Sequence, residues 1–413
     1  MRLLAALLLC LAIPAAANPL ADLVSGADSR APQLAGVVGV VATRDGILRA
    51  EAHGAADLAT GRRLTADSPV RVASVSKLVV AIAAWRLVEQ GVLGIDDDVS
   101  ARLGFRLRHP VHPDVPVTLR QLLSHTSGIV DGPGYGFALE DRLSDRLTAQ
   151  HWGATAPGGR FEYANLNYGI VATLMEKATG ERFDRLMTRL VLGPLRLDAG
   201  YNWQGVSNAG IARAAVLYRK GRDEAHWQPD GPWVAQVDDL QGQRSACPVN
   251  SRAGCDLAAY VPGTNGTLFS PQGGLRISLI DLARIGQLLL RGGELDGVRL
   301  LKRETVDAMF TPVWRAGAGV PGDDYGGQML CYAAGPQCLS GKAGAGDQPV
   351  PGARWVGHLG DAYGLLAGLW VDFARDRVMA YALTGSASDP FAAPRLVSRF
   401  TAAEDIIIAE LAR

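Results

Sequence analysis

The sequence predicts an α/β (α+β) protein in which an antiparallel sheet is flanked by helices and a helical lobe is inserted into the sheet lobe. Strand-like segments lie near both ends of the chain, and residues 96–262 between them carry helical runs with few alternating β-branched residues. The chain has 413 residues, 48% of them hydrophobic, which is enough to bury a large core. We therefore expect one domain over residues 18–413, with a sheet lobe at 18–95 and 263–413 and a helical lobe at 96–262.

The first 17 residues have the features of a secretory signal peptide. Arg2 precedes an apolar run from Leu3 to Ile13, and small residues follow up to Ala17. This run is too short to span a bilayer, which takes about 20 residues. Cleavage after Ala17 would give a secreted or periplasmic protein without a stable membrane anchor. A lipoprotein modified at Cys10 is the alternative, but the leucines at 7–9 are not the small residues that such a cleavage site prefers.

The sheet lobe is expected to begin with a hairpin and a helix. An apolar run at 34–42 and an alternating run at 47–52 are joined through Arg44, Asp45 and Gly46, which is a turn signal. Apolar residues at helical spacing then predict a helix over 74–91.

Further along the chain, helical runs at 119–123 and 168–178 belong to the expected helical lobe. The sheet signal returns at 365–373 and 378–383, around a turn, and an amphipathic helix is expected from about 395 to 411. The two ends of the chain should therefore build one sheet-and-helix layer.

The charge balance limits the partners. Lys plus Arg equals Asp plus Glu at 41 each, so no overall basic field exists to hold nucleic acid or an anionic membrane. A small-molecule or peptide substrate is the expected partner, and no cluster of residues implies a metal or an organic cofactor. The oligomeric state is left open by the sequence.

Four cysteines follow the signal peptide, in two closely spaced pairs, and export permits disulfides. The local pairing is Cys247 with Cys255 and Cys331 with Cys338, the second inside a Gly-rich stretch at 317–352. Free thiols are the alternative, and a zinc site is disfavoured because neither pair has the Cys-x-x-Cys spacing.

Ser74-Val75-Ser76-Lys77 is the first candidate for chemistry. Positions i and i+3 share a helix face, so the Ser74 hydroxyl comes within reach of the Lys77 amine. Burial would lower the lysine pKa from about 10.4 and let the neutral amine take the serine proton. The alternative is a capping serine and a surface lysine, but the apolar residues that follow Lys77 are an unusual setting for a solvated charge.

Tyr163-Ala164-Asn165 is the second candidate, just before a helical run. A tyrosine phenol near a cationic lysine can have its pKa lowered enough to relay protons, and the Asn165 amide can hold a substrate carbonyl. A packed tyrosine with a turn-capping asparagine is the alternative interpretation.

The third candidate is His358-Leu359-Gly360, just before a predicted strand. Gly360 would leave room for a substrate beside the backbone, and His358 can donate to a carboxylate or a carbonyl. A structural histidine is the alternative.

These segments resemble, in order, the landmarks of the class C β-lactamase, DD-peptidase and esterase group. The residues that carry the resemblance are Ser74–Lys77, Leu122–Gly128, Tyr163–Asn165, Gly273–Leu275 leading into Asp281–Ala283, and Gly357–Gly360. The resemblance implies a β-lactamase/transpeptidase-like fold with its active site between the two lobes.

The resemblance also implies roles for single residues. Ser74 would be the nucleophile, Lys77 and Tyr163 its proton-transfer partners, and Asn165 a contact for the substrate amide. The backbone amides of Ser74 and Asp361 would form an oxyanion hole. In this group the 122–128 segment is a structural loop, so we expect no catalytic role for His125 or Ser127.

One departure bears on the substrate. The β-lactamase branch usually has Lys-Thr-Gly at the third landmark, where this chain has His358-Leu359-Gly360, as in peptidases and esterases of the group. We therefore expect an exported serine hydrolase that acts on esters or D-amino acyl peptides in preference to β-lactams. Lys342-Ala343-Gly344 is an alternative third landmark, but no strand pattern surrounds it. A non-catalytic relative that binds cell-wall peptide or a partner is the rival hypothesis.

Overall fold

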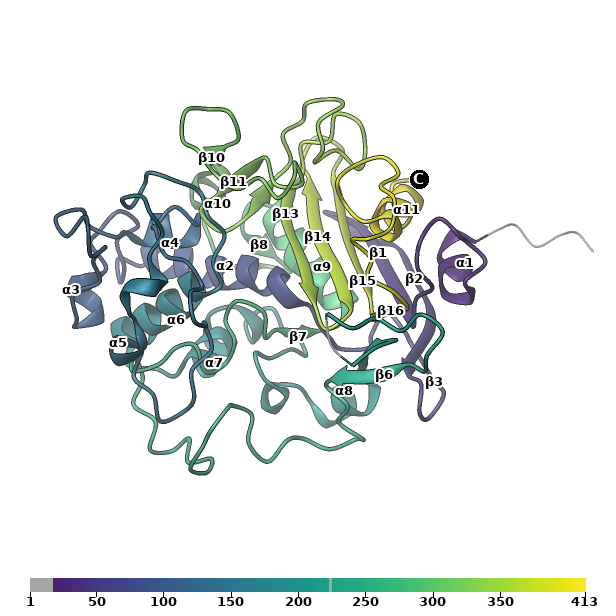
Figure 1. The fold of residues 1–413 in the computed structure, drawn as a ribbon, viewed down its shortest axis with the longest axis horizontal. Coiled ribbons are helices and arrows are strands. Elements are labelled where there is room, and N and C mark those ends of the chain that lie inside the picture. Colours follow the sequence, from purple (N-terminus) through teal and green to yellow (C-terminus); the bar gives the residue numbers. More distant parts are fainter. Residues whose placement is uncertain (1–17, 223–224) are drawn as a thin grey trace, which may run out of the picture.

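In the computed structural model, which describes residues 18–222 and 225–413, a nine-stranded antiparallel sheet runs in the order β10-β11-β12-β13-β14-β15-β1-β2-β3 (Figure 1). The predicted signal peptide at 1–17 lies outside the described residues. Within those residues, no helix is both long and apolar enough to cross a lipid bilayer.

The strands are β1 (Gly36–Thr43), β2 (Gly46–Asp57), β3 (Arg62–Arg63), β4 (Val70–Arg71), β5 (Leu217–Arg219), β6 (Val234–Val237), β7 (Arg276–Ile277), β8 (Glu294–Leu295), β9 (Val298–Arg299), β10 (Pro312–Arg315), β11 (Cys331–Ala333), β12 (Gln337–Cys338), β13 (Val356–Ala362), β14 (Leu365–Asp372), β15 (Arg377–Leu383) and β16 (Gly385–Ser386).

The α-helices are α1 (Pro19–Ser25), α2 (Ser76–Glu89), α3 (Ser100–Leu103), α4 (Leu119–Leu123), α5 (Leu143–Arg146), α6 (Leu166–Thr179), α7 (Phe183–Met187), α8 (Asn208–Arg213), α9 (Leu279–Leu290), α10 (Arg303–Phe310) and α11 (Ala402–Leu411). A short 3-10 helix, η1 (Ala73–Val75), precedes α2.

The two ends of the chain meet in the middle of the sheet. Strand β1 pairs with β15 in the register Val37↔Leu383 to Ala42↔Val378, and β14 lies on the far side of β15. The expected hairpin at the N-terminal end and the two expected late strands are therefore confirmed, and so is the α+β class with an antiparallel sheet.

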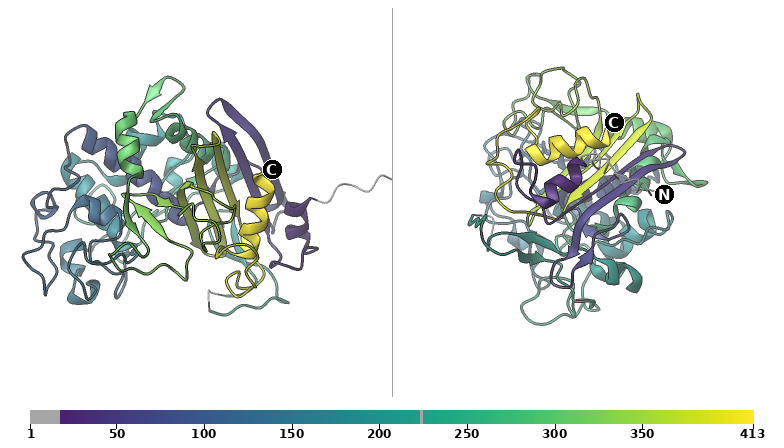
Figure 2. Two further views of the ribbon diagram at one scale, coloured as in Figure 1. Left: turned by 90° about the horizontal axis from the view of Figure 1, so that it is seen from above. Right: turned by 90° about the vertical axis from the view of Figure 1, so that its right-hand side faces the viewer.

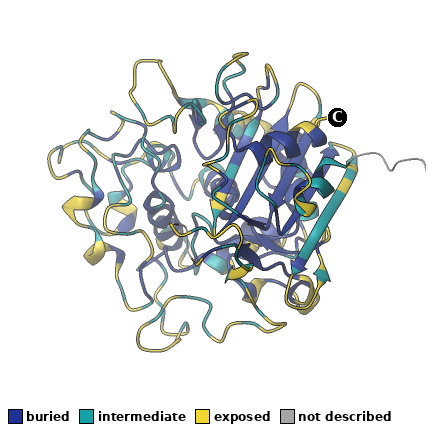
Figure 3. Ribbon diagram, turned by 45° about the vertical axis from the view of Figure 1, so that its right-hand side comes forward, coloured by how far each residue is buried: buried dark blue, intermediate teal, exposed yellow. Residues whose placement is uncertain are grey.

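Helices cover both faces of this sheet (Figures 1 and 2). Helices α1 and α11 pack on one face, in a core that includes Leu20, Trp370 and Ile407. Helices α2 and α9 lie on the opposite face, in the largest core of the molecule. Strands β14 and β15 are buried on both faces, as Figure 3 shows by colour, because each face carries a helix layer.

The last helix begins later than the sequence predicts. It starts at Ala402, whereas the apolar pattern placed its start near Arg395. The reason is a capping box, in which the Thr401 hydroxyl accepts the backbone N–H of Glu404 and the Glu404 carboxylate accepts the backbone N–H of Thr401. The Asp405 carboxylate also accepts the backbone N–H groups of residues 397 and 398, which holds that segment outside the helix. The helix is buried along nearly all of its length, so it is not the amphipathic helix that was expected.

The range 96–262, expected as a helical lobe, contains helices α3 to α8 and two strands. Helices α3 to α7 gather at one end of the molecule, away from the sheet (Figure 1). Strand β5 pairs with β6 and with β16, so these two strands of the range lie next to the segment that follows β15.

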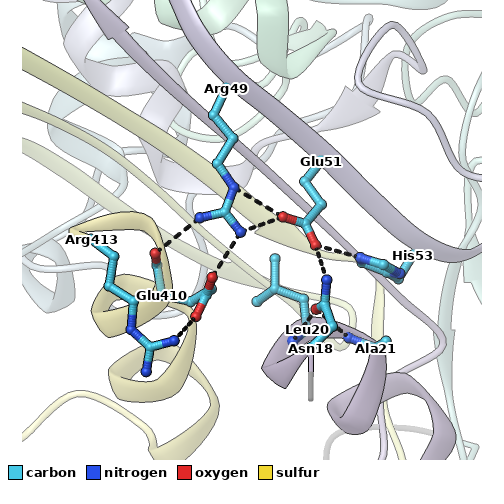
Figure 4. A network of polar contacts seen from close by, with 8 residues as sticks. All are labelled: Asn18, Leu20, Ala21, Arg49, Glu51, His53, Glu410 and Arg413. Carbon is cyan, nitrogen blue, oxygen red and sulfur yellow. Dashed lines mark hydrogen bonds and ion pairs between the residues drawn. The ribbon is translucent and has the colours of Figure 1, made fainter. Parts of the chain in front are cut away.

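A polar network fastens the two terminal helices to the sheet (Figure 4). Arg49 of β2 donates to the Glu51 carboxylate at 3.0 Å and to the Glu410 carboxylate of α11 at 2.8 Å. Glu51 also accepts from the Asn18 amide at 2.5 Å, and Asn18 caps the first turn of α1. Burial would raise the pKa of Glu51, but the hydrogen bonds from Asn18, His53 and Arg49 outweigh it and lower that pKa to about 2.

Candidate active site

Lys77 lies in the first turn of α2 and is completely buried. The helix is buried on nearly every side because it passes through the largest core of the molecule, which explains its continuous apolar sequence. The alternative of a solvated surface lysine is therefore excluded.

Ser74 is presented by a strained turn. The residue before it, Ala73, has a φ of 45°, in the left-handed region that L-residues avoid. Strand β13 passes directly beside this turn, because a Cβ built on Gly360 would lie 2.4 Å from the Val72 carbonyl oxygen and 3.3 Å from the Ser74 backbone nitrogen. Gly360 is thus required where β13 approaches the turn, and the space it leaves is taken by the Ser74 turn, whereas the sequence analysis expected it to leave room for a substrate.

Three acceptors surround the Lys77 Nζ. It lies 2.9 Å from the Ser74 Oγ, 2.9 Å from the Asn165 Oδ1 and 3.0 Å from the Gln272 carbonyl oxygen. Burial lowers the Lys77 pKa to about 7, although the charge of Asp131 partly opposes this. Near neutral pH the amine is therefore divided between its neutral and its charged form.

Tyr163 is surrounded by aromatic rings. It packs against a cluster in which Phe161 stacks on Trp314 of β10, with ring centroids 4.1 Å apart. The His125 ring also stacks on it, with ring centroids 4.2 Å apart, and the His125 Nδ1 accepts the backbone N–H of Ala164. His125 lies in the loop to which we assigned no catalytic role, and its contacts give it a positioning role here.

The Tyr163 pKa differs from the expected value. Burial raises it well above its usual range, and a hydrogen bond with Ser74 offsets this only in part. The expectation that the nearby lysine would lower this pKa was wrong, because loss of solvent around the phenol has the largest effect on it. Tyr163 is accordingly a protonated phenol next to Ser74, with its ring centroid 4.7 Å from the Lys77 Nζ.

Asn165 is oriented by an acid that the sequence analysis missed. The Asn165 Nδ2 donates to the Asp131 Oδ2 at 2.9 Å, which turns its carbonyl oxygen toward Lys77. The other oxygen of Asp131 accepts the backbone N–H of Leu166 at the start of α6. Asp131 lies 34 residues before Asn165 in a loop without periodic pattern, and its only signal was an acid next to the turn at Gly132.

His358 faces inward rather than toward a substrate. Its Nδ1 donates to the Leu359 carbonyl oxygen at 2.5 Å, and its Nε2 accepts from the Tyr332 hydroxyl at 2.7 Å. Burial and the charge of Lys77 lower the His358 pKa to about 3, so the ring is neutral. The expected donation from His358 to a substrate is corrected by these contacts, because both ring nitrogens are already hydrogen-bonded within the protein.

The candidate residues surround one cavity of about 500 Å³. Ser74, Tyr163 and Asn165 form one part of its wall, and β13 forms another through His358, Gly360 and Asp361. The structure thus places every predicted substrate-binding and catalytic residue at this cavity except Lys77. Lys77 does not line the cavity, because it is buried, but its Nζ contacts the Ser74 Oγ. Lys342, the alternative third landmark, is exposed and is not among the residues that line this cavity.

Both local disulfides are present. Cys247 is bonded to Cys255, and Cys331 is bonded to Cys338. The second closes the β11–β12 hairpin, next to the Tyr332 that contacts His358.

Comparison with known proteins identifies the family to which this arrangement of residues belongs. A family model described as beta-lactamase matches residues 22–404. Esterase EstB of Burkholderia gladioli is 33% identical over 223 residues, which cover 49% of this chain and 55% of the esterase. A penicillin-binding protein of Bacillus subtilis is 30% identical over 225 residues, covering 50% of this chain and 48% of that protein. The matches thus span only about half of the length of these curated relatives.

Solved structures share the fold over a greater length. A D-amino acid amidase from Ochrobactrum anthropi superposes with a TM-score of 0.65 at 17% identity, covering 95% of this chain and 96% of the amidase. At this level of identity the likeness concerns the fold alone.

Proposed function

The chain belongs to the beta-lactamase family of serine hydrolases, and from that premise we propose that it forms an acyl-enzyme on Ser74 and transfers the acyl group to water. Esters, D-amino acid amides and D-amino acyl peptides are the proposed substrates. The observation that carries the proposal is the 2.9 Å contact between the Ser74 Oγ and a buried Lys77 whose pKa is about 7.

The partners of Lys77 determine the direction of proton transfer. The Asn165 Oδ1 and the Gln272 carbonyl oxygen can only accept hydrogen bonds, so each takes an N–H of the amine. In the neutral amine, the lone pair is then left for the third partner, the Ser74 hydroxyl. Lys77 can therefore receive the serine proton as the Oγ attacks the substrate carbonyl.

Tyr163 supplies a second proton path. Its high pKa keeps the phenol protonated, so it suits donation toward the leaving group better than removal of the serine proton. In this mechanism the leaving alcohol or amine departs with a proton that passes through Tyr163, and Lys77 restores it.

The oxyanion hole is proposed at the junction of the strained turn and β13. The Ser74 and Asp361 backbone N–H groups belong to the two segments that meet there, and the close approach of Gly360 to the Ser74 nitrogen supports this placement. Two such donors would stabilise the negative charge of the tetrahedral intermediate.

Export is also part of the proposal. The signal-peptide pattern of residues 1–17 and the two disulfides favour a secreted or periplasmic location.

Labelling with a fluorophosphonate tests the nucleophile. Intact-protein mass spectrometry should show one adduct on the wild-type protein and none on Ser74→Ala, while the surface variant Ser144→Ala is labelled like the wild type. Circular dichroism would verify that Ser74→Ala is folded. A labelled Ser74→Ala protein would disprove the assignment, and an unlabelled wild-type protein would favour the rival hypothesis of a non-catalytic binder.

A further inference from the structure

Aromatic side chains that the chemistry at Ser74 does not use surround the mouth of the cavity. Tyr135, Tyr325, Tyr363 and Phe391 all line it, with exposed fractions of 38%, 45%, 41% and 41%. We call these four residues the aromatic rim. Across the described residues, the one other large exposed aromatic side chain is Phe373, which lies outside the cavity and packs against Phe310.

The rim is assembled from four segments that are far apart in the sequence. Tyr135 lies between α4 and α5, Tyr325 between β10 and β11, Tyr363 between β13 and β14, and Phe391 between β16 and α11. Exposed apolar residues that are scattered over a surface need no explanation, whereas a group that converges on one cavity is typical of a binding surface.

Two rim residues have backbone conformations that disfavour a tyrosine. Tyr325 has a φ of 52° and Tyr363 a φ of 58°, and each is followed by a glycine that also has a positive φ. Glycine or asparagine fits such positions, and a bulky residue there costs on the order of 1 to 3 kcal/mol. The benefit of these tyrosines must therefore lie in their side chains.

Both strained tyrosines are held in place by neighbours. The Tyr325 ring meets Tyr163 edge to face, with centroids 6.1 Å apart, so a group bound on Tyr325 would lie next to the reacting centre. The Arg71 guanidinium lies 5.4 Å from the centre of the Tyr363 ring and donates to the Asp238 carboxylate at 3.0 Å. These two rings are thus held by the protein before a ligand arrives, which lowers the entropic cost of binding.

The charges around the cavity favour an uncharged ligand group. Its lining contains one arginine, Arg71, whose guanidinium is engaged by Asp238, and the exposed acid Asp361. Glu404 also lines it, but its buried carboxylate is engaged by Thr401 and Tyr381. A ligand carboxylate at the rim would find no unpaired arginine and would face Asp361, whereas a neutral aromatic ring would bury apolar surface against the rings of the rim.

We propose that the aromatic rim binds an uncharged aryl group of the substrate, so that the enzyme prefers aryl-bearing esters and amides to short alkyl ones. The inference rests on the proposed function, because it concerns the substrate of the same site.

Three esters test the preference: methyl butyrate, methyl 4-phenylbutyrate and benzyl butyrate, followed by pH-stat titration. At least one aryl ester should exceed methyl butyrate in kcat/KM by about tenfold or more, which corresponds to about 1.4 kcal/mol. The ester that is preferred shows whether the rim serves the acyl group or the leaving group. Equal values for all three esters would overturn the proposal while leaving the proposed hydrolase intact.

Variants connect the preference to the rim. Tyr325→Leu and Phe391→Leu should each lower the ratio of aryl to alkyl kcat/KM several-fold, and Phe373→Leu should leave it unchanged. Phe391→Leu matters most, since it does not contact Tyr163, and an unchanged ratio in both rim variants would contradict the assignment.

A binding measurement separates this inference from the hydrolase proposal. Ser74→Ala should bind 4-phenylbutyramide more tightly than butyramide by calorimetry, even if no ester is hydrolysed by the wild-type protein. Equal binding of the two amides would refute the rim whatever the outcome for catalysis.

Discussion

At the scale of single residues, burial gives Lys77 its chemical character. An exposed lysine has a pKa near 10.4 and is almost entirely protonated at pH 7. Here the core around α2 lowers the Lys77 pKa to about 7, and two carbonyl oxygens hold the amine so that its lone pair faces Ser74. In the proposed mechanism, the base is thus an ordinary lysine whose burial lowers its pKa.

The pH dependence of the reaction should report this pKa. Only neutral Lys77 can accept the serine proton, so kcat/KM for an uncharged ester should rise with pH, reach its midpoint near pH 7 and level off above about pH 8. Asp131 raises the Lys77 pKa through its charge, so Asp131→Asn should move the rising limb to lower pH. A rise in kcat/KM centred near pH 10, or no change in kcat/KM between pH 5 and 9, would contradict the role of Lys77 as the base.

Gly360 should tolerate no side chain. In Gly360→Ala the new methyl group would overlap the Val72 carbonyl oxygen and press on the turn that presents Ser74. We expect a loss of kcat/KM of about 10²-fold, as for a reacting group displaced by about 1 Å. Thermal unfolding should show a destabilisation of about 1 to 3 kcal/mol.

Gly46→Ala is the matched control, because a Cβ at that hairpin position has open space around it. If Gly360→Ala retained wild-type kcat/KM, the close approach of β13 to the Ser74 turn would not matter for catalysis.

The sequence predicted those residues whose geometry is local. Ser74 and Lys77 are one helical turn apart, so their contact follows from spacing alone. The inward orientation of His358, the high pKa of Tyr163 and the support from Asp131 depend on segments far away in the chain, such as the hairpin that carries Tyr332. No periodic pattern records such contacts.

At the scale of elements, the hairpin β1–β2 and the helices α1 and α11 depend on one another. Arg49 and Glu51 on β2 contact α11 through Glu410 and α1 through Asn18 (Figure 4). Glu51 is ionised in the folded protein down to about pH 2, below its usual pKa of about 4.3. Its stabilising effect is therefore complete above pH 5 and is lost as the pH falls toward 2.

Replacing this carboxylate should weaken the attachment of both terminal helices. Glu51→Gln should lower the free energy of unfolding by about 1 to 3 kcal/mol at pH 7, because hydrogen bonds to a charged group are lost. The difference from the wild type should shrink as the pH is lowered from 5 to 3. Urea denaturation at several pH values measures it, with the exposed Glu304→Gln as control, and a difference independent of pH would contradict the role of the charge.

Element boundaries were predicted best where a local signal exists. The helix at 119–123 and the late strands agree with the structure because their periodic patterns end at turn residues or caps. The predicted start of α11 does not agree with the structure. An apolar stretch continues before the helix, and only the capping pair Thr401 and Glu404 marks where the helix begins. Strands β5 and β6 were missed. They form a sheet with β16, which pairs with β5 and lies more than 140 residues further along the chain.

At the scale of the whole molecule, the cavity lies where the helix-rich part meets the sheet. Ser74 comes from the segment before α2, Tyr163 and Asn165 precede α6, and Asp361 comes from the sheet. The sequence predicted this arrangement through the order of its landmarks. It could not predict the shape of the cavity, which depends on the aromatic loops around it.

The substrate preference follows from this whole surface. His358 is neutral and buried where a cationic side chain would fix a substrate carboxylate, and the one arginine of the lining, Arg71, is engaged by Asp238. We expect an ester or a D-amino acid amide to have a higher kcat/KM than a cephalosporin, with β-lactams acting at most as slow acylating inhibitors. Steady-state kinetics on the purified protein decide this. A cephalosporin that is tenfold better, or about 1.4 kcal/mol in the transition state, would contradict it.

The disulfide between Cys331 and Cys338 has a practical consequence for producing the protein. It links the two strands of the hairpin that carries Tyr332, and the Tyr332 hydroxyl is hydrogen-bonded to His358. The centroids of the His358 and Tyr163 rings are 6.1 Å apart. Material made in a reducing cytoplasm would carry free thiols at this hairpin, and the support behind the site would be looser. Batches with different redox histories should then differ in specific activity at equal purity, so a thiol count belongs with every activity measurement.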